Sequence, residues 1–204
     1  YKEGEVGQEI IYTIMEDAVI DYTTEVDGFD LTNRYTPGRT NVGVIKMWND
    51  DNNRDGKRPT EVTVQLVANG TAVAGKTLTL NSQNSWTGTF SNLLEYENGQ
   101  KISYTVQELS VDGYETEVTG TAAGGYTITN SYEPEIMEIT CAKTWDDDNN
   151  RDGKRPESIT IRLYADGTEL TDRAKTIMAT DNWSWSFENL PKYKEGEVGQ
   201  EIIY

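Results

Sequence analysis

Three polar side chains lie in segments that otherwise have the pattern of apolar β-strands. Lys46 is in VGVIKMW and Asn130 in YTITNSY, each on a strand face shared with apolar or aromatic residues. Glu108 ends ISYTVQE, on the face of Tyr104 and Val106 if the strand bulges slightly, or one position off if it does not. Such groups are costly in a core unless paired, and burial makes a lysine amine a neutral nucleophile. The pattern alone favours a plain hydrogen-bonded network, or a Lys46 that reaches solvent, over a reactive group.

Two internal repeats decide how these residues are grouped. The block YKEGEVGQEIIY occurs at Tyr1–Tyr12 and again, unchanged, at Tyr193–Tyr204. The block WNDDNNRDGKRP at Trp48–Pro59 recurs with one difference at Trp145–Pro156, 97 residues later. Repeats on this scale are typical of module arrays. We therefore interpret the chain as a window of a tandem array, either one translational repeat of a longer rod or an assembly whose half-modules complete each other.

Phasing on the second repeat divides the chain into three segments. We expect residues 1–38 to be the C-terminal part of one module, residues 39–134 a complete module, and residues 135–204 the N-terminal part of the next. The joints between them, Thr36–Gly38 and Glu133–Glu135, are short and contain proline. Such joints favour a semi-rigid rod over flexibly linked modules.

Nearly every segment of a module has the pattern of a β-strand. Thr60–Ala68 and its repeat Ser158–Ala165 alternate apolar and polar residues, and each is followed by Asn-Gly or Asp-Gly, a strong hairpin signal. Further strands are predicted at Val42–Trp48, Lys76–Leu80, Ser85–Phe90, Ile102–Glu108, Tyr114–Thr119 and Gly125–Tyr132. About seven short strands per module predict an all-β fold of tandem immunoglobulin-like β-sandwiches.

The composition excludes several functions. A formal net charge of −17, spread along the chain, disfavours nucleic-acid and anionic-membrane partners, and no apolar run is long enough to insert into a bilayer. The chain has no histidine and one cysteine, which excludes Cys–His metal sites, an intrachain disulfide and histidine-dependent triads. Cys141 takes the position of Val44 in the other repeat, so we expect a small buried side chain, with a reactive thiol as the minor alternative.

Several motifs resemble those of a known family, and the resemblance extends over the whole chain. They are the lysine-bearing strand before Trp48, Asp50–Pro59 (DDNNRDGKRP), Asn84–Leu93 (NSWTGTFSNL), Tyr104–Glu108 (YTVQE), Asp112–Tyr114 (DGY) and Thr127–Tyr132 (TITNSY). The chain is similar in these motifs to CnaB-type repeats, the B-region modules of Gram-positive surface adhesins and pilins. The resemblance implies a prealbumin-like, immunoglobulin-like sandwich without a cofactor.

The family resemblance also implies a covalent crosslink. Members commonly join a first-strand lysine to a last-strand asparagine by a spontaneous isopeptide bond that an acidic residue assists. Matched residue by residue, the pair is Lys46 and Asn130, and Glu108 is the assisting acid. Burial would keep Glu108 protonated, so that it polarises the Asn130 carbonyl and shuttles protons. Proximity in a fixed core is worth roughly 7–11 kcal/mol of barrier. Each module reacts once, so this is self-modification and not enzyme turnover.

The second module carries the same three residue types on its two separated parts. Lys143 lies in CAKTW, whereas Glu16 lies in YTIME and Asn33 in LTNRY. In a continuous array Lys143 would meet the next copies of Glu16 and Asn33. Within this chain they could meet only between molecules or through a back-fold. Glu16 is followed by DAVIDY, not by the PxGY-like segment that the family often has.

One further motif imitates a calcium loop. Asp51, Asn53 and Asp55, and their repeat, follow the spacing at the start of an EF-hand. The position of the bidentate glutamate holds Val62 in one copy and Ile159 in the other, so the ligand set is incomplete. A turn braced by Asx hydrogen bonds is favoured over a metal site.

We expect from these features a structural stalk that projects a ligand-binding domain from a bacterial cell wall, with neighbouring repeats as its partners and a host ligand bound by another domain. The alternative is an adhesive module whose sandwich surface binds a host protein or glycan. Trp86, Trp183 and Trp185 could line such a surface, although packing in the sheets explains them as well.

Overall fold

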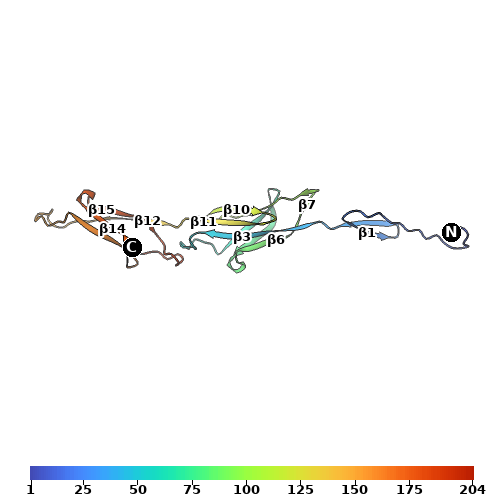
Figure 1. The fold of residues 1–204 in the computed structure, drawn as a ribbon, viewed down its shortest axis with the longest axis horizontal. Coiled ribbons are helices and arrows are strands. Elements are labelled where there is room, and N and C mark those ends of the chain that lie inside the picture. Colours follow the sequence, from blue (N-terminus) through green and yellow to red (C-terminus); the bar gives the residue numbers. More distant parts are fainter. The chain divides into compact units, whose positions relative to one another are not determined.

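The computed structural model describes residues 1–204, and it is built almost entirely from strands (Figure 1). The strands are β1 (Tyr22–Asp27), β2 (Asp30–Tyr35), β3 (Arg39–Asn49), β4 (Glu61–Ala68), β5 (Thr71–Asn81), β6 (Thr87–Leu94), β7 (Tyr96–Glu97), β8 (Gln100–Lys101), β9 (Tyr104–Glu108), β10 (Glu115–Thr121), β11 (Gly125–Ser131), β12 (Ile136–Ala142), β13 (Ser158–Ala165), β14 (Thr168–Met178) and β15 (Ser184–Pro191). Short 3₁₀ turns follow β5 and β14, at Ser82–Asn84 and Ala179–Asp181. The predicted all-β class is confirmed, and none of the helices is long or apolar enough to cross a membrane.

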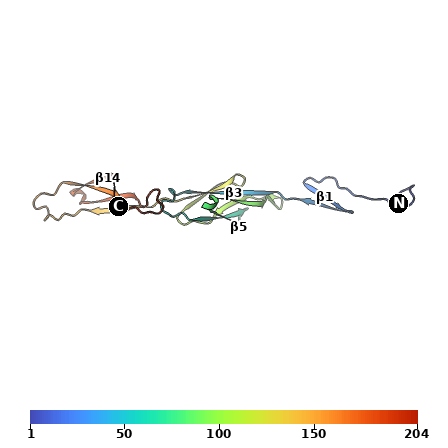
Figure 2. The same cartoon turned by 90° about the horizontal axis from the view of Figure 1, so that it is seen from below.

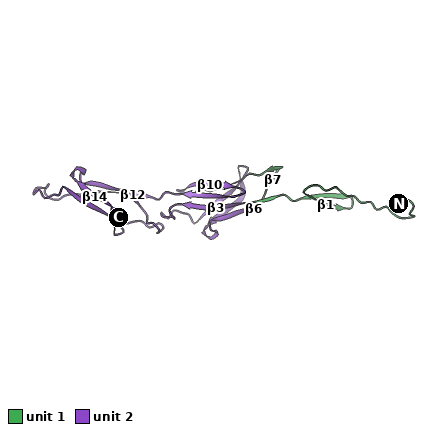
Figure 3. Cartoon of the chain, in the orientation of Figure 1, with its two compact units in different colours: residues 1–41, 91–103 green, residues 42–90, 104–204 purple.

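The chain divides into two compact units, coloured separately in Figure 3. Unit 1 contains residues 1–41 and 91–103, and unit 2 contains residues 42–90 and 104–204. In unit 1, β1 and β2 form an antiparallel hairpin in which Tyr22 pairs with Tyr35, and every residue of both strands is exposed. The YTIME segment that carries Glu16 is not a strand, although the equivalent YTVQE segment is β9. A strand needs a ladder partner for its backbone groups, and β9 has one in β4.

Two sheets face each other in the central sandwich. One has the strand order β10-β11-β3-β6 and the other β5-β4-β9. Figure 2 views these layers from a direction in which β3 and β5 are separately labelled. The first and last strands of the module, β3 and β11, are neighbours and run parallel, with Lys46 opposite Ile128 and Trp48 opposite Asn130. This pairing brings distant parts of the sequence together.

The core of the sandwich follows from strand alternation. In β4, Val62, Val64 and Leu66 are buried while the residues between them are not. Val42 and Val44 of β3 are buried in the same way, at 0% and 1% exposure. Each buried side chain of this size contributes roughly 1.5–3 kcal/mol relative to an exposed one. The apolar face of each sheet therefore fixes which residues point inward.

The hairpin predicted at Asn69-Gly70 is present, whereas one predicted strand starts later than expected. Asn69 and Gly70 join β4 to β5 with φ of +49° and +81°, values that suit a tight hairpin turn. The predicted strand at Ser85–Phe90 starts later than expected, at Thr87. Ser85 has a φ of +54° and closes the preceding 3₁₀ turn, so it cannot be part of an extended strand.

The C-terminal segment is half of a sandwich. Its strands form two antiparallel pairs, β12 with β15 and β13 with β14. A small core of Leu163, Phe187 and Leu190 lies among them. The prediction that Cys141 is buried is wrong, because its side chain is only partly covered whereas Val44 is 1% exposed. The physical reason is that this segment contains no counterparts of β9, β10 and β11.

Candidate functional site

Lys46 points into the closed core of the central sandwich. Its side chain and that of Glu108 have no exposed surface, and Nζ of Lys46 lies 3.4 Å from Oε1 of Glu108. The amine also donates to the backbone oxygen of Met47 at 3.2 Å and lies 4.3 Å from the ring centre of Trp48. Lys46 therefore does not extend to solvent, and its position on β3 follows from the alternation that also buries Val44.

Burial changes the acid–base behaviour of the lysine. The pKa of Lys46 is lowered from 10.5 to about 8, because burial disfavours the charged amine more than the nearby carboxylates of Glu108 and Asp50 favour it. A neutral amine is the nucleophilic form of lysine. The lowered pKa therefore increases the neutral fraction of this amine relative to an ordinary lysine.

Glu108 reaches the same interior from the opposite sheet. In β9, Tyr104, Val106 and Glu108 are all buried and the residues between them are exposed. The register with β4 is continuous, so no bulge is needed. The expectation that an unbulged strand would place Glu108 one position off was wrong, since positions 104, 106 and 108 share one face of a regular strand.

Asn130 completes the group on β11, the strand beside β3. It has 0% exposure, and neither Nδ2 nor Oδ1 has a hydrogen-bond partner. Oε1 of Glu108 also lacks a hydrogen-bond partner. Buried amide atoms without partners cost about 1–3 kcal/mol each, so this arrangement is not a satisfied polar network. It places an amide without hydrogen-bond partners on the strand next to the one that carries the buried amine.

A second polar group lies at the end of β3 and anchors the same strand. Asp50 is 2% exposed and accepts from Nε and Nη2 of Arg58 at 2.9 and 2.5 Å, and from the hydroxyl of Tyr114 at 2.9 Å. The ring of Trp48 packs edge-on against Tyr114, with centres 5.1 Å apart. Burial alone would raise the pKa of Asp50, but the hydrogen bonds from Arg58, the Asn53 amide and Tyr114 outweigh it and lower the pKa.

The candidate residues of the split module lie in different units. Lys143 of unit 2 is exposed, donates to the backbone oxygen of Thr144 at 2.9 Å and lies 4.7 Å from the ring centre of Trp145. Glu16 and Asn33 of unit 1 are exposed. The local geometry of Lys143 resembles that of Lys46, although nothing in its own half-sandwich covers it.

The EF-hand-like motif is a braced turn. The side chain of Asn53 accepts from the backbone amide of Arg58, and Asp51 pairs with Arg54. Oδ2 of Asp55 accepts from the Tyr132 hydroxyl and the backbone amide of Glu135. The three side chains thus serve different partners and do not converge on one point.

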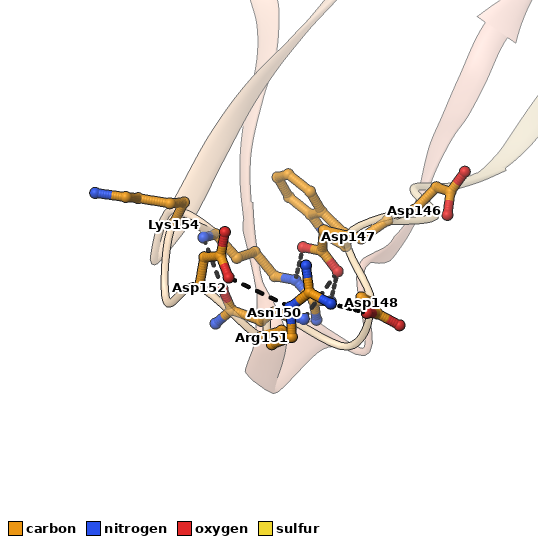
Figure 4. Close-up of a pocket in the computed structure, with 9 residues that line it drawn as sticks. Asp146, Asp147, Asp148, Asn150, Arg151, Asp152 and Lys154 are labelled. Carbon is orange, nitrogen blue, oxygen red and sulfur yellow. Dashed lines mark hydrogen bonds and ion pairs between the residues drawn. The ribbon is translucent and has the colours of Figure 1, made fainter.

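The repeated loop has the same construction, and Figure 4 shows its side chains. Asp147 accepts from Arg155 at 3.0 and 2.6 Å, and Arg151 pairs with Asp148 at 2.7 Å. The Asn150 side chain accepts from the amide of Arg155 at 2.9 Å. The loop therefore holds its shape through its own charges.

The tryptophans pack against each other within the central sandwich and within the C-terminal segment. Trp86 lies edge-on to Trp48 at 5.2 Å, and Trp183, which is 9% exposed, lies edge-on to Trp145 at 5.1 Å. Trp185 is partly buried against the C-terminal core. These contacts favour the packing interpretation over a sugar-binding surface.

The sequence reasoning missed one polar residue in this region. The hydroxyl of Thr116, on β10, donates to Oε2 of Glu108 at 3.2 Å. Thr116 is also directly opposite Asn130 in the pairing of β10 with β11. A signal was present, because a threonine follows the glutamate by eight residues in both modules, at Glu16 and Thr24 and at Glu108 and Thr116.

Comparisons with known proteins identify the family. The model of the Cna protein B-type domain matches residues 1–34, 42–131 and 139–204. The chain is 48% identical over 194 residues to the collagen adhesin of Staphylococcus aureus, a match that covers 94% of this chain and 16% of the adhesin. A crystal structure of two B repeat units of the S. aureus collagen-binding protein is 45% identical, with a TM-score of 0.68, and the match covers 97% of this chain and 52% of that one.

A crystal structure of a single B repeat unit of the same protein is 40% identical, with a TM-score of 0.43, over 81% of this chain and 82% of that one. The chain thus spans a small part of the full-length adhesin that it resembles and about half of the two-repeat structure. The predicted resemblance is confirmed: this chain belongs to the family of Cna protein B-type domains.

Proposed function

We propose that the chain is a structural stalk repeat of a bacterial surface adhesin, stiffened by an autocatalytic isopeptide bond between Lys46 and Asn130. One observation carries the proposal. The buried amine of Lys46 contacts the Glu108 carboxyl, and the strand beside it holds the Asn130 amide, whose side-chain atoms have no other hydrogen-bond partner.

The reaction follows from these three groups. The neutral amine of Lys46 attacks Cγ of Asn130, and the Glu108 carboxyl polarises the amide oxygen as the new C–N bond forms. Glu108 then passes the proton lost by the amine to Nδ2 of Asn130, which leaves as ammonia. The product is one amide bond and one ammonia for each module, so the protein modifies itself once and does not turn over a substrate.

The place of this bond in the fold suits a stalk. It would join β3 to β11, the first and last strands of the module, which already lie side by side. A pulling force that enters through the first strand and leaves through the last would pass through the crosslink and bypass the rest of the sandwich. The bond would also restrict the unfolded chain, as a disulfide does.

We extend the proposal to the split module. The domain division into residues 1–38, 39–134 and 135–204 implies that Lys143 reacts with the copy of Asn33 in the following segment, assisted by the copy of Glu16. The matching geometry of Lys143 and Lys46, each with its amine over the tryptophan two residues later, supports this extension.

The relatives point to where such a repeat would act. They are named a collagen adhesin and a collagen-binding protein of Staphylococcus aureus. We propose that this chain belongs to a wall-anchored cell-surface protein, that its partners are neighbouring repeats, and that another domain binds the host ligand. The formal charge of −17 disfavours nucleic acid as a partner.

The test is the intact mass of the purified chain under denaturing conditions. We expect a deficit of one ammonia in the monomer, lost in the variants Lys46→Arg and Glu108→Gln and kept in Lys143→Arg. A two-ammonia deficit in a monomer would mean that the split module also closes within the chain, and covalent oligomers would mean that it closes between chains. A mass equal to the full calculated value, for the chain without substitutions, would refute the crosslink.

A further inference from the structure

We propose that Thr116 is a positioning residue for the crosslinking reaction, which holds one oxygen of Glu108 so that the other faces Lys46. The inference rests on the proposed function, and it assigns a role to a residue outside the lysine, acid and asparagine group.

The two oxygens of Glu108 have different surroundings. Oε2 accepts a hydrogen bond from the hydroxyl of Thr116 at 3.2 Å. Oε1 has no hydrogen-bond partner and lies 3.4 Å from Nζ of Lys46. Thr116 therefore fixes the rotation of the carboxyl group, and the oxygen that exchanges protons with the amine is Oε1. A side-chain carboxyl is free to rotate about its last bond unless such a contact holds it.

Strand pairing places Thr116 where it can do this. It lies on β10 directly opposite Asn130 on β11, so the threonine, the acid and the asparagine come from three strands. Thr116 lies on the edge strand β10 and is exposed as a residue, so its substitution changes little buried apolar surface.

The other module repeats the arrangement independently. In unit 1 the hydroxyl of Thr24 lies 3.1 Å from Oε2 of Glu16 and 2.6 Å from Oδ1 of Asn33. Thr24 is directly opposite Asn33, as Thr116 is opposite Asn130. One carboxylate oxygen of the acid is engaged by the threonine in both modules, although the segment that carries Glu16 is not a strand. The threonine contact is therefore a recurring feature of the hairpin and its acid, not a consequence of one packed core.

The role of the hydroxyl is limited to orientation. In the reaction the Nζ–Cγ bond forms, the Cγ–Nδ2 bond of Asn130 breaks, and one amine proton travels through Oε1 of Glu108 to the departing ammonia. Thr116 keeps its own proton throughout, and its hydrogen bond to Oε2 persists. Misplacement of a catalytic group by about 1 Å can cost a hundredfold in rate.

The experiment measures the rate of ammonia loss. The full chain is recovered in denaturant from insoluble expression, before it has folded and reacted, and is then refolded by dilution and sampled for intact mass over time. We expect Thr116→Val, which keeps the branched shape but removes the hydroxyl, to slow the loss about tenfold to a hundredfold. Thr116→Ser, which keeps the hydroxyl, should react at a rate near that of the chain without substitutions.

A matched control separates orientation from strand stability. Thr119 lies on β10 on the opposite face and is also exposed, so Thr119→Val should leave the rate unchanged. In an Asn130→Ala background, which cannot react, the two valine variants should unfold at similar denaturant concentrations. A slow rate in both valine variants, or an unchanged rate in Thr116→Val, would overturn the inference. If the chain without substitutions lost no ammonia, the proposed function itself would be refuted.

Discussion

Nζ of Lys46 lies 3.4 Å from Oε1 of Glu108, and neither side chain has exposed surface. The two groups lie on β3 and β9, which are strands of the two facing sheets, so the contact crosses the core of the sandwich. Burying two polar groups is costly unless they are paired, and a buried pair adds little net stability even when it is intact. Such a pair is better explained by the chemistry that it makes possible than by the stability that it supplies.

The crosslink should dominate the stability of the central sandwich. Lys46→Ala removes the proposed bond between residues 46 and 130, and the long loop that such a bond would close corresponds to about 4 kcal/mol. For a module of this size we expect the melting temperature to fall by roughly 15–30 °C, as measured by calorimetry. The control is Lys143→Ala, an exposed lysine at the equivalent repeat position, which should leave this transition in place. Equal melting temperatures for both variants would contradict the prediction.

The rate of crosslinking should depend on pH through Lys46. Burial lowers its pKa to about 8, so below that pH the amine is mostly protonated and above it mostly neutral. We expect the rate of ammonia loss on refolding to drop about tenfold for each pH unit below 8 and to level off above it. The measurement is a series of refolding time courses followed by intact mass. A rate that stays constant between about pH 6 and 8 would exclude the lysine as the titrating nucleophile.

The Asp50 network should matter more in the closed module than in the half-module. Asp50→Asn leaves Arg58 with a weakened partner in a nearly buried site, where the Asp50 side chain is 1% exposed. We expect a loss of about 3 kcal/mol in the free energy of unfolding. Asp147→Asn changes the equivalent pair with Arg155, where the carboxylate is 29% exposed, and should cost less, because solvent weakens an exposed ion pair. Denaturant titrations of both variants give the comparison.

The lowered pKa of Asp50 also predicts how the stability of the protein changes in acid. Its folded-state pKa is lowered, so its contribution to stability is present above the ordinary carboxyl pKa and is lost as the pH falls through the folded-state value. The chain without substitutions should therefore lose stability in acid more steeply than the Asp50→Asn variant. Parallel stability curves for the two proteins would argue against this role.

The joint after the central module should be held by Asp55. Its Oδ2 accepts from the amide of Glu135 at 2.6 Å and from the Tyr132 hydroxyl at 3.1 Å. Asp55→Ala removes the oxygen that accepts both hydrogen bonds, so we expect faster hydrogen exchange at the Glu135 amide and faster proteolysis next to Pro134. The control Asp152→Ala alters the equivalent exposed residue, whose side chain pairs only with Arg151, and should leave this joint unchanged. Exchange at Glu135 that is the same in both variants would show that Asp55 does not secure the joint.

Much of the fold could be predicted because it depends on local pattern. Alternation placed Val62, Val64 and Leu66 on one face, and the pleat of a strand makes that assignment independent of the rest of the chain. Asn69-Gly70 marked a hairpin because few other residues adopt its positive φ values. The repeats and the CnaB-like motifs identified the family, and the inward positions of Lys46 and Asn130 followed from the same alternation.

The tertiary structure decided which of these residues meet. The parallel pairing of β3 with β11 and the facing of β9 depend on burying whole sheet faces, which local periodicity does not specify. Only that packing brings Glu108 to Lys46 and adds Thr116 to the group. It also explains why Cys141 is partly exposed where Val44 is buried: a side chain is covered only when all the strands around it are present.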